Sequence, residues 1–445
     1  MELLDLPPEL LERVMVLYVK KYGIVEAWKI RKICKTFSIH IDRVIFAEQP
    51  ISAFLRTKEH NARAILKNNL VSYLIHHTNN LAGAHKFLPD FLNGMLEGLL
   101  EGLANNEKKN MKRTAYLRLL CELLVKRSGD TVWSFVTMTS AASTNKMSSI
   151  KFAKSIEISK VAAAAAVGSL DALRRGLQND RQRLWEESDA FGYPLTLAAE
   201  GNHVEIVQAI VKSFEEYQHK YPASMPKPYF MLAIDAAMTE RFIGIAALLL
   251  KIYHKYFPVL PQRYFDTWLA QAILTGNHDL IRSVKALKTV GGTAGYVMGF
   301  RMACEQGDAQ IARMFIDDGH LDINQGLPYD TFPLEIAFNT GHANVVELLL
   351  RLGADPDGPH KRWPHARLLW TAIAENKDQM VKLLLDWGAN PHLVQGDGDK
   401  TSRRFKTGCS AIAIAESIKE AKQKVDYFAD RYVQRTNFAT DAEVL

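Results

Sequence analysis

Cysteine is scarce in this chain of 445 residues. There are four, at Cys34, Cys121, Cys304 and Cys409, and no two of them form a Cys-x-x-Cys pair. This spacing argues against a disulfide scaffold and against a zinc site built from paired thiolates. It is typical of free thiols in a reducing compartment, so we expect an intracellular protein that is cytoplasmic, nuclear or both.

Long apolar runs and blocks of like charge are also absent. No apolar run reaches about 18 residues, and the N-terminal MELLDLPPELLERV has acidic residues where a signal peptide has an apolar core. We therefore expect no membrane contact. The net charge is +6, but Lys and Arg are scattered among Asp and Glu. Such a pattern indicates an ordinary solvated surface, and no nucleic-acid partner is expected.

Motifs of catalysis and metal binding are missing as well. Neither Gly-x-Ser-x-Gly nor His-Glu-x-x-His occurs, and no carboxylate stands at ligand spacing from His76 and His77. His203, His278 and His342 lie at or beside recurring turns, where a histidine usually bonds to backbone. We predict a protein that is not an enzyme and that has no catalytic, cofactor or metal site.

The chain repeats itself with a period near 35 residues. Seven segments each begin with a small residue, continue with a turn residue and end in an apolar helical stripe. The turn residues are Gly168, Asn202, Glu240, Gly276, Gly307, Gly341 and Asn376, which are 31 to 38 residues apart. A period of this length with two short helices per unit predicts an all-α repeat array, in which each unit is stabilised by its neighbours.

The detailed residues resemble the ankyrin repeat. Residues 193–199 (YPLTLAA) and 332–337 (FPLEIA) are similar to that family's Thr-Pro-Leu-His-x-Ala opening. Leu348–Leu350 with the following GADP, and Leu383–Leu385 with GANP, resemble the end of its second helix. The resemblance implies an ankyrin-repeat solenoid of about seven to eight repeats over residues 156–430, of which several are degenerate.

The first 46 residues resemble the F-box motif. Leu6-Pro7-Pro8-Glu9-Leu10-Leu11 opens an apolar stripe, and Ile33-Cys34 with Phe37 follows later. The resemblance implies that this segment docks onto the Skp-type adaptor of a cullin ubiquitin ligase. The expected contacts are Leu6, Pro7, Leu10, Leu11, Ile33 and Phe37. The alternative is a helical N-terminal cap in which Pro7 and Pro8 only start a helix.

These features predict four parts: an F-box-like helical domain (1–46), a helical connector (47–155), the repeat array (156–430) and a C-terminal tail (431–445). The layout resembles predicted fungal proteins that join an F-box to ankyrin repeats. It implies the substrate-recognition subunit of a Skp-cullin-F-box (SCF-type) ubiquitin ligase. The alternative is a stand-alone ankyrin scaffold without a ubiquitin-ligase role. We expect a monomer with protein partners.

A candidate cargo site comes from aromatic and basic residues in the predicted fingers between repeats. The insert PHKRWPHAR, residues 359–367, lies between two well-formed repeats. Trp and Arg are enriched at interface hot spots. The predicted cargo contacts are Phe191, Tyr193, Tyr329, Arg362, Trp363, His365 and Arg367. For Trp363 two alternatives remain open, an exposed anchor or a side chain folded back onto a neighbouring repeat.

Overall fold

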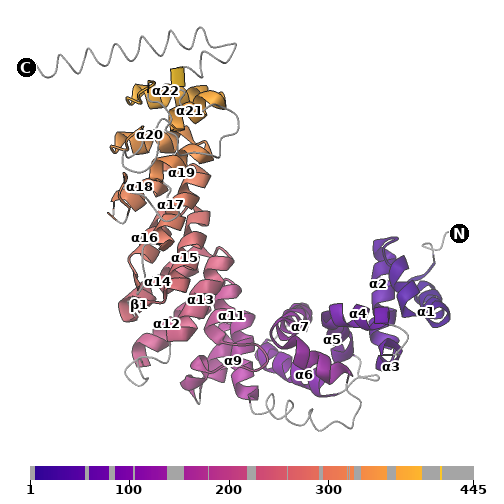
Figure 1. Ribbon diagram of the computed structural model, residues 1–445. Helices are drawn as coiled ribbons and strands as arrows, with labels where there is room; N and C mark the ends of the chain where they lie inside the picture. The colour runs from indigo at the N-terminus through magenta and orange to yellow at the C-terminus, as the bar shows by residue number, and fades with distance from the viewer. Residues whose placement is uncertain are drawn as a thin grey trace, which may run out of the picture. The chain divides into compact units, whose positions relative to one another are not determined.

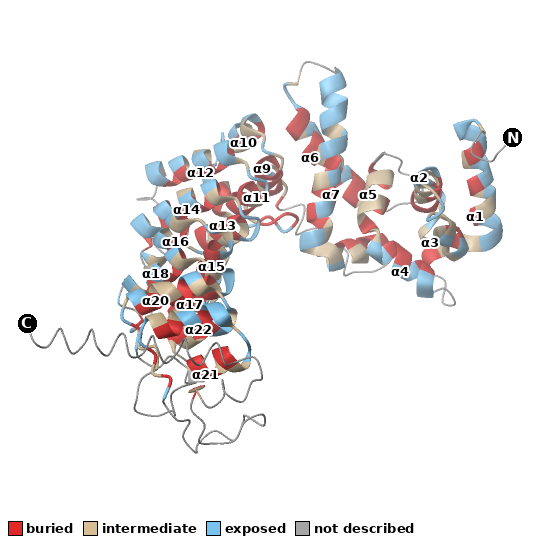
Figure 2. Ribbon diagram, turned by 90° about the horizontal axis from the view of Figure 1, so that it is seen from above, coloured by how far each residue is buried: buried red, intermediate tan, exposed pale blue. Residues whose placement is uncertain are grey.

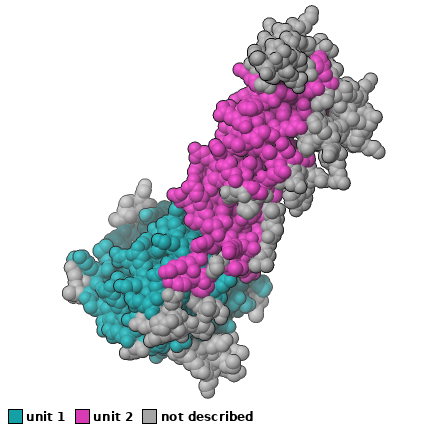
Figure 3. All heavy atoms as spheres, turned by 90° about the vertical axis from the view of Figure 1, so that its left-hand side faces the viewer, with its two compact units in different colours: residues 1–253 teal, residues 254–445 magenta. Residues whose placement is uncertain are grey.

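The computed structural model describes residues 6–55, 60–79, 86–103, 106–137, 155–178, 180–217, 227–257, 259–289, 294–317, 319, 321–324, 332–357, 367–392 and 411–412. The chain divides into two compact units, residues 1–253 and 254–445, coloured teal and magenta in Figure 3. The predicted all-α fold is confirmed: in the described residues the only named strands are two of two residues each. The boundary between the units falls inside the predicted array, and the predicted domain limits stay predictions.

The first unit begins with a kinked helix, α1 (Pro8–Ile30). Pro7 caps the helix with φ −50° and ψ 142°, and Pro8 stands in the first helical turn, where its missing N–H breaks no intrahelical bond. Gly23 interrupts the helix with φ 83° and ψ 170°. Helix α2 (Lys35–Arg43) follows, and the Cys34 Sγ accepts a hydrogen bond from the backbone N–H of Phe37 at its start.

A small apolar core holds these helices together. Helix α1 buries Leu11, Met15 and Val19, spaced four residues apart as helical geometry requires. The π-helix η2 (Val44–Glu48) contributes Phe46. Its ring packs edge-on against that of Trp28, with ring centroids 5.6 Å apart, and stacks on that of Phe54, with centroids 6.3 Å apart. Three short helices come next: α3 (Ile51–Phe54), α4 (His60–Asn68) and α5 (Leu70–Asn79).

The connector helices α6 (Phe87–Leu100) and α7 (Asn106–Thr137) pack on each other, and α6 also packs on the first helix of the repeats. Phe91 of α6 stacks on Phe191 with ring centroids 6.0 Å apart. The Arg175 guanidinium donates to the Gly98 carbonyl at 3.0 Å, and the Arg127 guanidinium donates to Glu200 at 2.8 Å. These helices therefore cover the open end of the repeats, as the cap of a repeat array does.

Seven helix pairs follow within the described residues, and Figure 1 colours them from magenta through orange along the chain. Those that begin in the first unit are α9 (Ile156–Ala166) with α10 (Leu170–Gly176), α11 (Pro194–Glu200) with α12 (Val204–Tyr217), and α13 (Lys227–Thr239) with α14 (Ile243–Tyr256). Those of the second unit are α15 (Gln262–Thr275) with α16 (His278–Lys285), α17 (Ala294–Gln306) with α18 (Ala309–Asp317), α19 (Pro333–Thr340) with α20 (Ala343–Arg351), and α21 (Arg367–Ala374) with α22 (Asp378–Asp386). The 3-10 helix η3 (Arg181–Trp185) precedes α11, and strands β1 (Val259–Leu260) and β2 (Lys288–Thr289) pair in parallel. In Figure 2 the buried residues lie mainly where one helix faces another.

Each pair turns through one residue in the left-handed region. These residues are Gly168, Asn202, Arg241, Gly276, Gly307, Gly341 and Asn376. Six of them are the turn residues that the sequence predicts, and the third prediction was wrong by one residue, because Arg241 rather than Glu240 takes the positive φ of 60°. The reason is the register: the Phe242 N–H bonds the carbonyl of Ala237, not of Ala236, just as the His203 N–H bonds that of Ala198.

Neighbouring pairs are joined by side chains at the turns. The His203 Nε2 lies 2.9 Å from the carbonyl oxygen of Ala166, one repeat earlier, and the His342 Nε2 lies 3.1 Å from that of Glu305. Both contacts span 37 residues. In the second unit the Asp357 carboxylate also accepts from the backbone N–H of Asn390 at 2.9 Å. Both histidines bond to backbone, as the sequence indicates.

Because of these contacts, two glycines with the same backbone conformation should differ in how much stability is lost when each is replaced by Ala. Gly276 has φ 67° and open space where a Cβ would stand, whereas at Gly307, with φ 68°, a Cβ would lie 2.6 Å from the His342 Nδ1. We expect Gly276→Ala to lower the free energy of unfolding by about 1–2 kcal/mol, the backbone cost alone. Gly307→Ala should cost about 1–2 kcal/mol more, because His342 must leave its carbonyl partner. Urea unfolding followed by circular dichroism measures both, and equal losses would exclude the histidine contact.

Candidate binding surfaces

The predicted adaptor contacts divide between the surface and the core. Pro7, Leu10 and Ile33 are exposed, with 51% of Leu10 and 67% of Ile33 open to solvent, and Leu6 is half-buried. Leu11 and Phe37 are buried. The last two cannot contact a partner while α1 and α2 stay folded, because their side chains form the core beneath the surface. The predicted set is therefore corrected for Leu11 and Phe37.

Sequence reasoning missed the residues that continue the exposed face. Leu10, Val14 and Leu17 stand at helical spacing on α1 and are all exposed, with 59% of Leu17 open to solvent. We call these three residues the α1 stripe. Of the thirteen exposed large hydrophobic residues in the described part of the chain, six lie between positions 10 and 39. Helix α1 is thus apolar on two faces, and only one of them is covered by the fold.

Cations border the α1 stripe. By helical spacing Lys21 continues the stripe, and Arg13 and Lys20 lie along one side of it. All three are exposed, and they form no ion pair within the described residues. Lys32 and Lys35, just before and at the start of α2, are exposed as well. A partner that matches this surface combines apolar groups with acidic groups.

Charged side chains also lie close to this surface. The Glu12 carboxylate pairs with the Arg43 guanidinium at 3.2 Å and joins α1 to α2. Burial, followed by the nearby charge of Glu12, raises the pKa of Glu48. Burial also raises the pKa of Asp42, against the opposing effect of Arg31, whose guanidinium lies 3.7 Å from the centre of the Trp28 ring.

The structure corrects one predicted cargo contact. Phe191 is fully buried and stacks on Phe91 of the connector, so it belongs to the core and is not open to a cargo. Tyr193 remains partly exposed. Tyr329, Arg362, Trp363 and His365 lie outside the described residues, as does the side chain of Arg367 at the start of α21. Their role as cargo contacts stays a prediction.

A second aromatic residue, which sequence reasoning missed, stands beside Tyr193. The ring of Tyr229, on α13, lies 4.7 Å from that of Tyr193 at an interplanar angle of 46°. The Tyr193 hydroxyl donates to the Glu187 carboxylate at 2.9 Å. Burial and this hydrogen bond to a carboxylate raise the pKa of Tyr193 to about 12. Both rings are half-buried, so each keeps part of its surface in solvent.

A solved ankyrin repeat domain is among the structures that are similar to this chain. The crystal structure of the human ASB11 ankyrin repeat domain is 16% identical, covers 60% of this chain and 96% of that one, and superposes with a TM-score of 0.28. The repeats of this chain are defined by its own turns and hydrogen bonds. No family model matches the chain, and no curated protein does.

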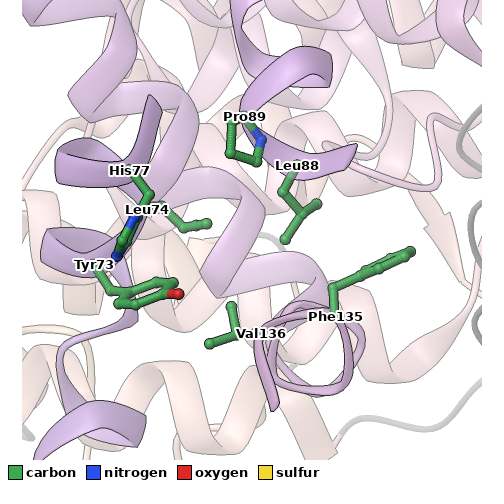
Figure 4. A pocket seen from close by; sticks show the side chains of 7 residues that line it. All are labelled: Tyr73, Leu74, His77, Leu88, Pro89, Phe135 and Val136. Carbon is green, nitrogen blue, oxygen red and sulfur yellow. The ribbon is translucent and has the colours of Figure 1, made fainter. Parts of the chain in front are cut away.

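The described residues also hold a small pocket between α5, α6 and the end of α7 (Figure 4). Its lining is Tyr73, Leu74, His77, Leu88, Pro89, Phe135 and Val136. Its volume of about 10 Å³ is room for roughly one water molecule, too little for an organic ligand. His77 packs on Tyr73 with ring centres 4.2 Å apart, and burial lowers the pKa of His76. This placement agrees with a structural role for both histidines.

The described part of the chain offers neither a metal site nor a membrane-spanning helix. Within the described residues, no group of three or more His, Cys, Asp or Glu side chains could hold a metal ion. Among the described helices, none has both the length and the apolar character to cross a bilayer.

Proposed function

We propose that this chain is a binding protein that recognises substrates for a cullin ubiquitin ligase. Its N-terminal helices dock onto a Skp-type adaptor, and its helix pairs hold a cargo protein. The observation that carries the proposal is the α1 stripe, an exposed apolar face on a helix whose other face already forms the core. The F-box resemblance of the same residues supplies the identity of the adaptor.

The α1 stripe favours a protein partner on physical grounds. A surface helix in water normally shows one apolar face, and a second one indicates that another molecule covers it. Three aliphatic side chains at the centre of an interface, with cations at its border, are a common arrangement of apolar core and polar rim. Leu10 and Ile33 belong both to this exposed set and to the motif.

The helix pairs supply the second half of the function. Pairs of the ankyrin type contact only their neighbours, and proteins built from them commonly bind partners on the inner helices and turns. Exposed apolar residues occur on three of these inner helices: Leu232 on α13, Leu274 on α15 and Met298 on α17. This supports a binding role for the pairs and leaves the cargo to be identified.

The adaptor proposal is tested with Leu10→Asp combined with Leu17→Asp. Both side chains are exposed, so the substitutions should leave the fold intact, while two buried carboxylates at the interface should weaken binding to a purified Skp-type adaptor by at least about tenfold. Val204→Asp is the matched control, because Val204 is also exposed but lies on α12. Titration calorimetry measures all three proteins.

Two results would overturn the proposal. If the unmodified chain does not bind the adaptor at micromolar concentration, the ligase role fails and a stand-alone scaffold remains. If the double variant binds as tightly as the Val204→Asp control, the α1 stripe is not the docking surface.

A further inference from the structure

The turn that leads into α11 and the start of α13 place two tyrosines and a carboxylate together at the edge of the second and third helix pairs. Tyr193 precedes Pro194 at the start of α11, and Tyr229 lies in the first turn of α13. With Glu187 they form a small group, which we call the Tyr-Tyr-Glu site. We propose that this site binds a cationic side chain, arginine or lysine, from a basic segment of the cargo. The inference rests on the cargo-binding half of the proposed function.

Buried aromatic side chains support the Tyr-Tyr-Glu site. The Tyr229 ring stacks on the buried Trp185 with centroids 6.2 Å apart, and Trp185 in turn packs against Phe214 and Phe230 at 5.9 and 6.1 Å. On the other side, the hydrogen bond to Glu187 fixes the Tyr193 hydroxyl. A cargo that binds here loses little side-chain entropy on the receptor, since both rings are already in place.

The sequence segment that carries Glu187 and Tyr193 is rich in acidic residues. Residues 184–200 hold Glu186, Glu187, Asp189 and Glu200 and no Lys, Arg or His. Glu200 is neutralised by Lys126 and Arg127, at 3.6 and 2.8 Å. The other three acids form no ion pair within the described residues. Lys227, two residues before Tyr229, is the nearest cation along α13. The excess of acidic residues in this segment attracts a cation and repels a phosphate or a carboxylate.

The chemistry of the group selects the same ligand. Aromatic faces attract ammonium and guanidinium groups through their quadrupole. Only one oxygen of Glu187 is bonded to Tyr193, and among the described residues nothing donates to the other. That oxygen can accept a charge-assisted hydrogen bond from a guanidinium seated against the rings. The neighbouring Leu232, exposed on the next turn of α13, offers an apolar contact for the methylene stem of the same side chain.

The test uses the full chain and three labelled peptides of equal length, in which arginine, glutamate or serine alternates with glycine. Fluorescence anisotropy at low salt should show binding of the arginine peptide and none of the glutamate peptide. Glu187→Gln and Tyr229→Leu should each weaken binding of the arginine peptide by about threefold to fivefold. Tyr193→Phe keeps the ring and should change it by less than about twofold. Glu97→Gln, at an exposed position of α6 with no ion pair among the described residues, is the control for a carboxylate elsewhere.

The outcomes separate this inference from the proposed function. Equal binding by the Glu187→Gln, Tyr229→Leu and Glu97→Gln proteins would overturn the site, because attraction to any carboxylate would then suffice. Preference for the glutamate peptide, or no binding of the arginine peptide, would overturn it as well. Glu187 is exposed, so its variant tests the site even if Tyr229→Leu loosens the fold. Adaptor binding at the α1 stripe is measured separately and does not depend on these results.

Discussion

Replacing Phe191 with Ala should lower the free energy of unfolding of the first unit by about 3–5 kcal/mol. The side chain is fully buried, and its ring stacks on Phe91 of α6 at 6.0 Å. Removing it leaves a cavity where the connector meets the first helix pairs, so the loss includes both transfer to water and the unfilled volume. Urea unfolding followed by tryptophan fluorescence should show the loss, because Trp185 lies in the same unit.

Two further variants test whether the stability loss comes from the buried contact between Phe191 and Phe91. Tyr193→Ala, two residues later and partly exposed, should cost less than half as much. A double-mutant cycle with Phe91→Ala should give a coupling energy of about 0.5–1.5 kcal/mol, as expected for two rings in contact. If Phe191→Ala instead leaves stability unchanged and weakens cargo capture, Phe191 is a binding residue, as the sequence alone suggests.

The repeats could be predicted because their signals are local. A helix that must turn within a few residues needs one backbone position at positive φ, and Gly or Asn supplies it cheaply. Six of the seven turns carry such a residue in the predicted place. The third pair has none, so its register could be read only from the alanines, and Ala236 and Ala237 are indistinguishable without the hydrogen bond from Phe242.

The binding residues were harder to predict, because exposure depends on contacts far along the chain. Phe191 is buried by helix α6, about a hundred residues earlier, and that helix shows no repeat pattern. Nothing near Phe191 in the sequence distinguishes it from Tyr193. The α1 stripe, in contrast, could have been predicted from the sequence, because Leu10, Val14 and Leu17 follow helical spacing. Leu11, Met15 and Val19 follow the same spacing on the face that is buried. Two apolar stripes on one helix predict one covered by the fold and one by a partner.

The second large effect is expected inside the helix pairs, at Leu349. It is fully buried on α20, which packs on α18, α19 and α22, and its carbonyl accepts from the Ala354 N–H at 3.0 Å where the helix ends. Leu349→Ala should lower the free energy of unfolding of the second unit by about 2–5 kcal/mol. Because pairs stabilise each other only through their contacts, amide exchange should speed up in α18 and α22 as well as in α20.

The adjacent Leu348 provides the matched control for Leu349. It belongs to the same leucine triplet but is only half-buried, so Leu348→Ala should cost about 1 kcal/mol or less. The difference between the two substitutions measures how much one leucine contributes by lying between pairs, since composition, helix propensity and distance from the helix end are nearly the same. Similar losses at both positions, or a loss under about 0.5 kcal/mol at Leu349, would mean that α20 presents a different face to its neighbours.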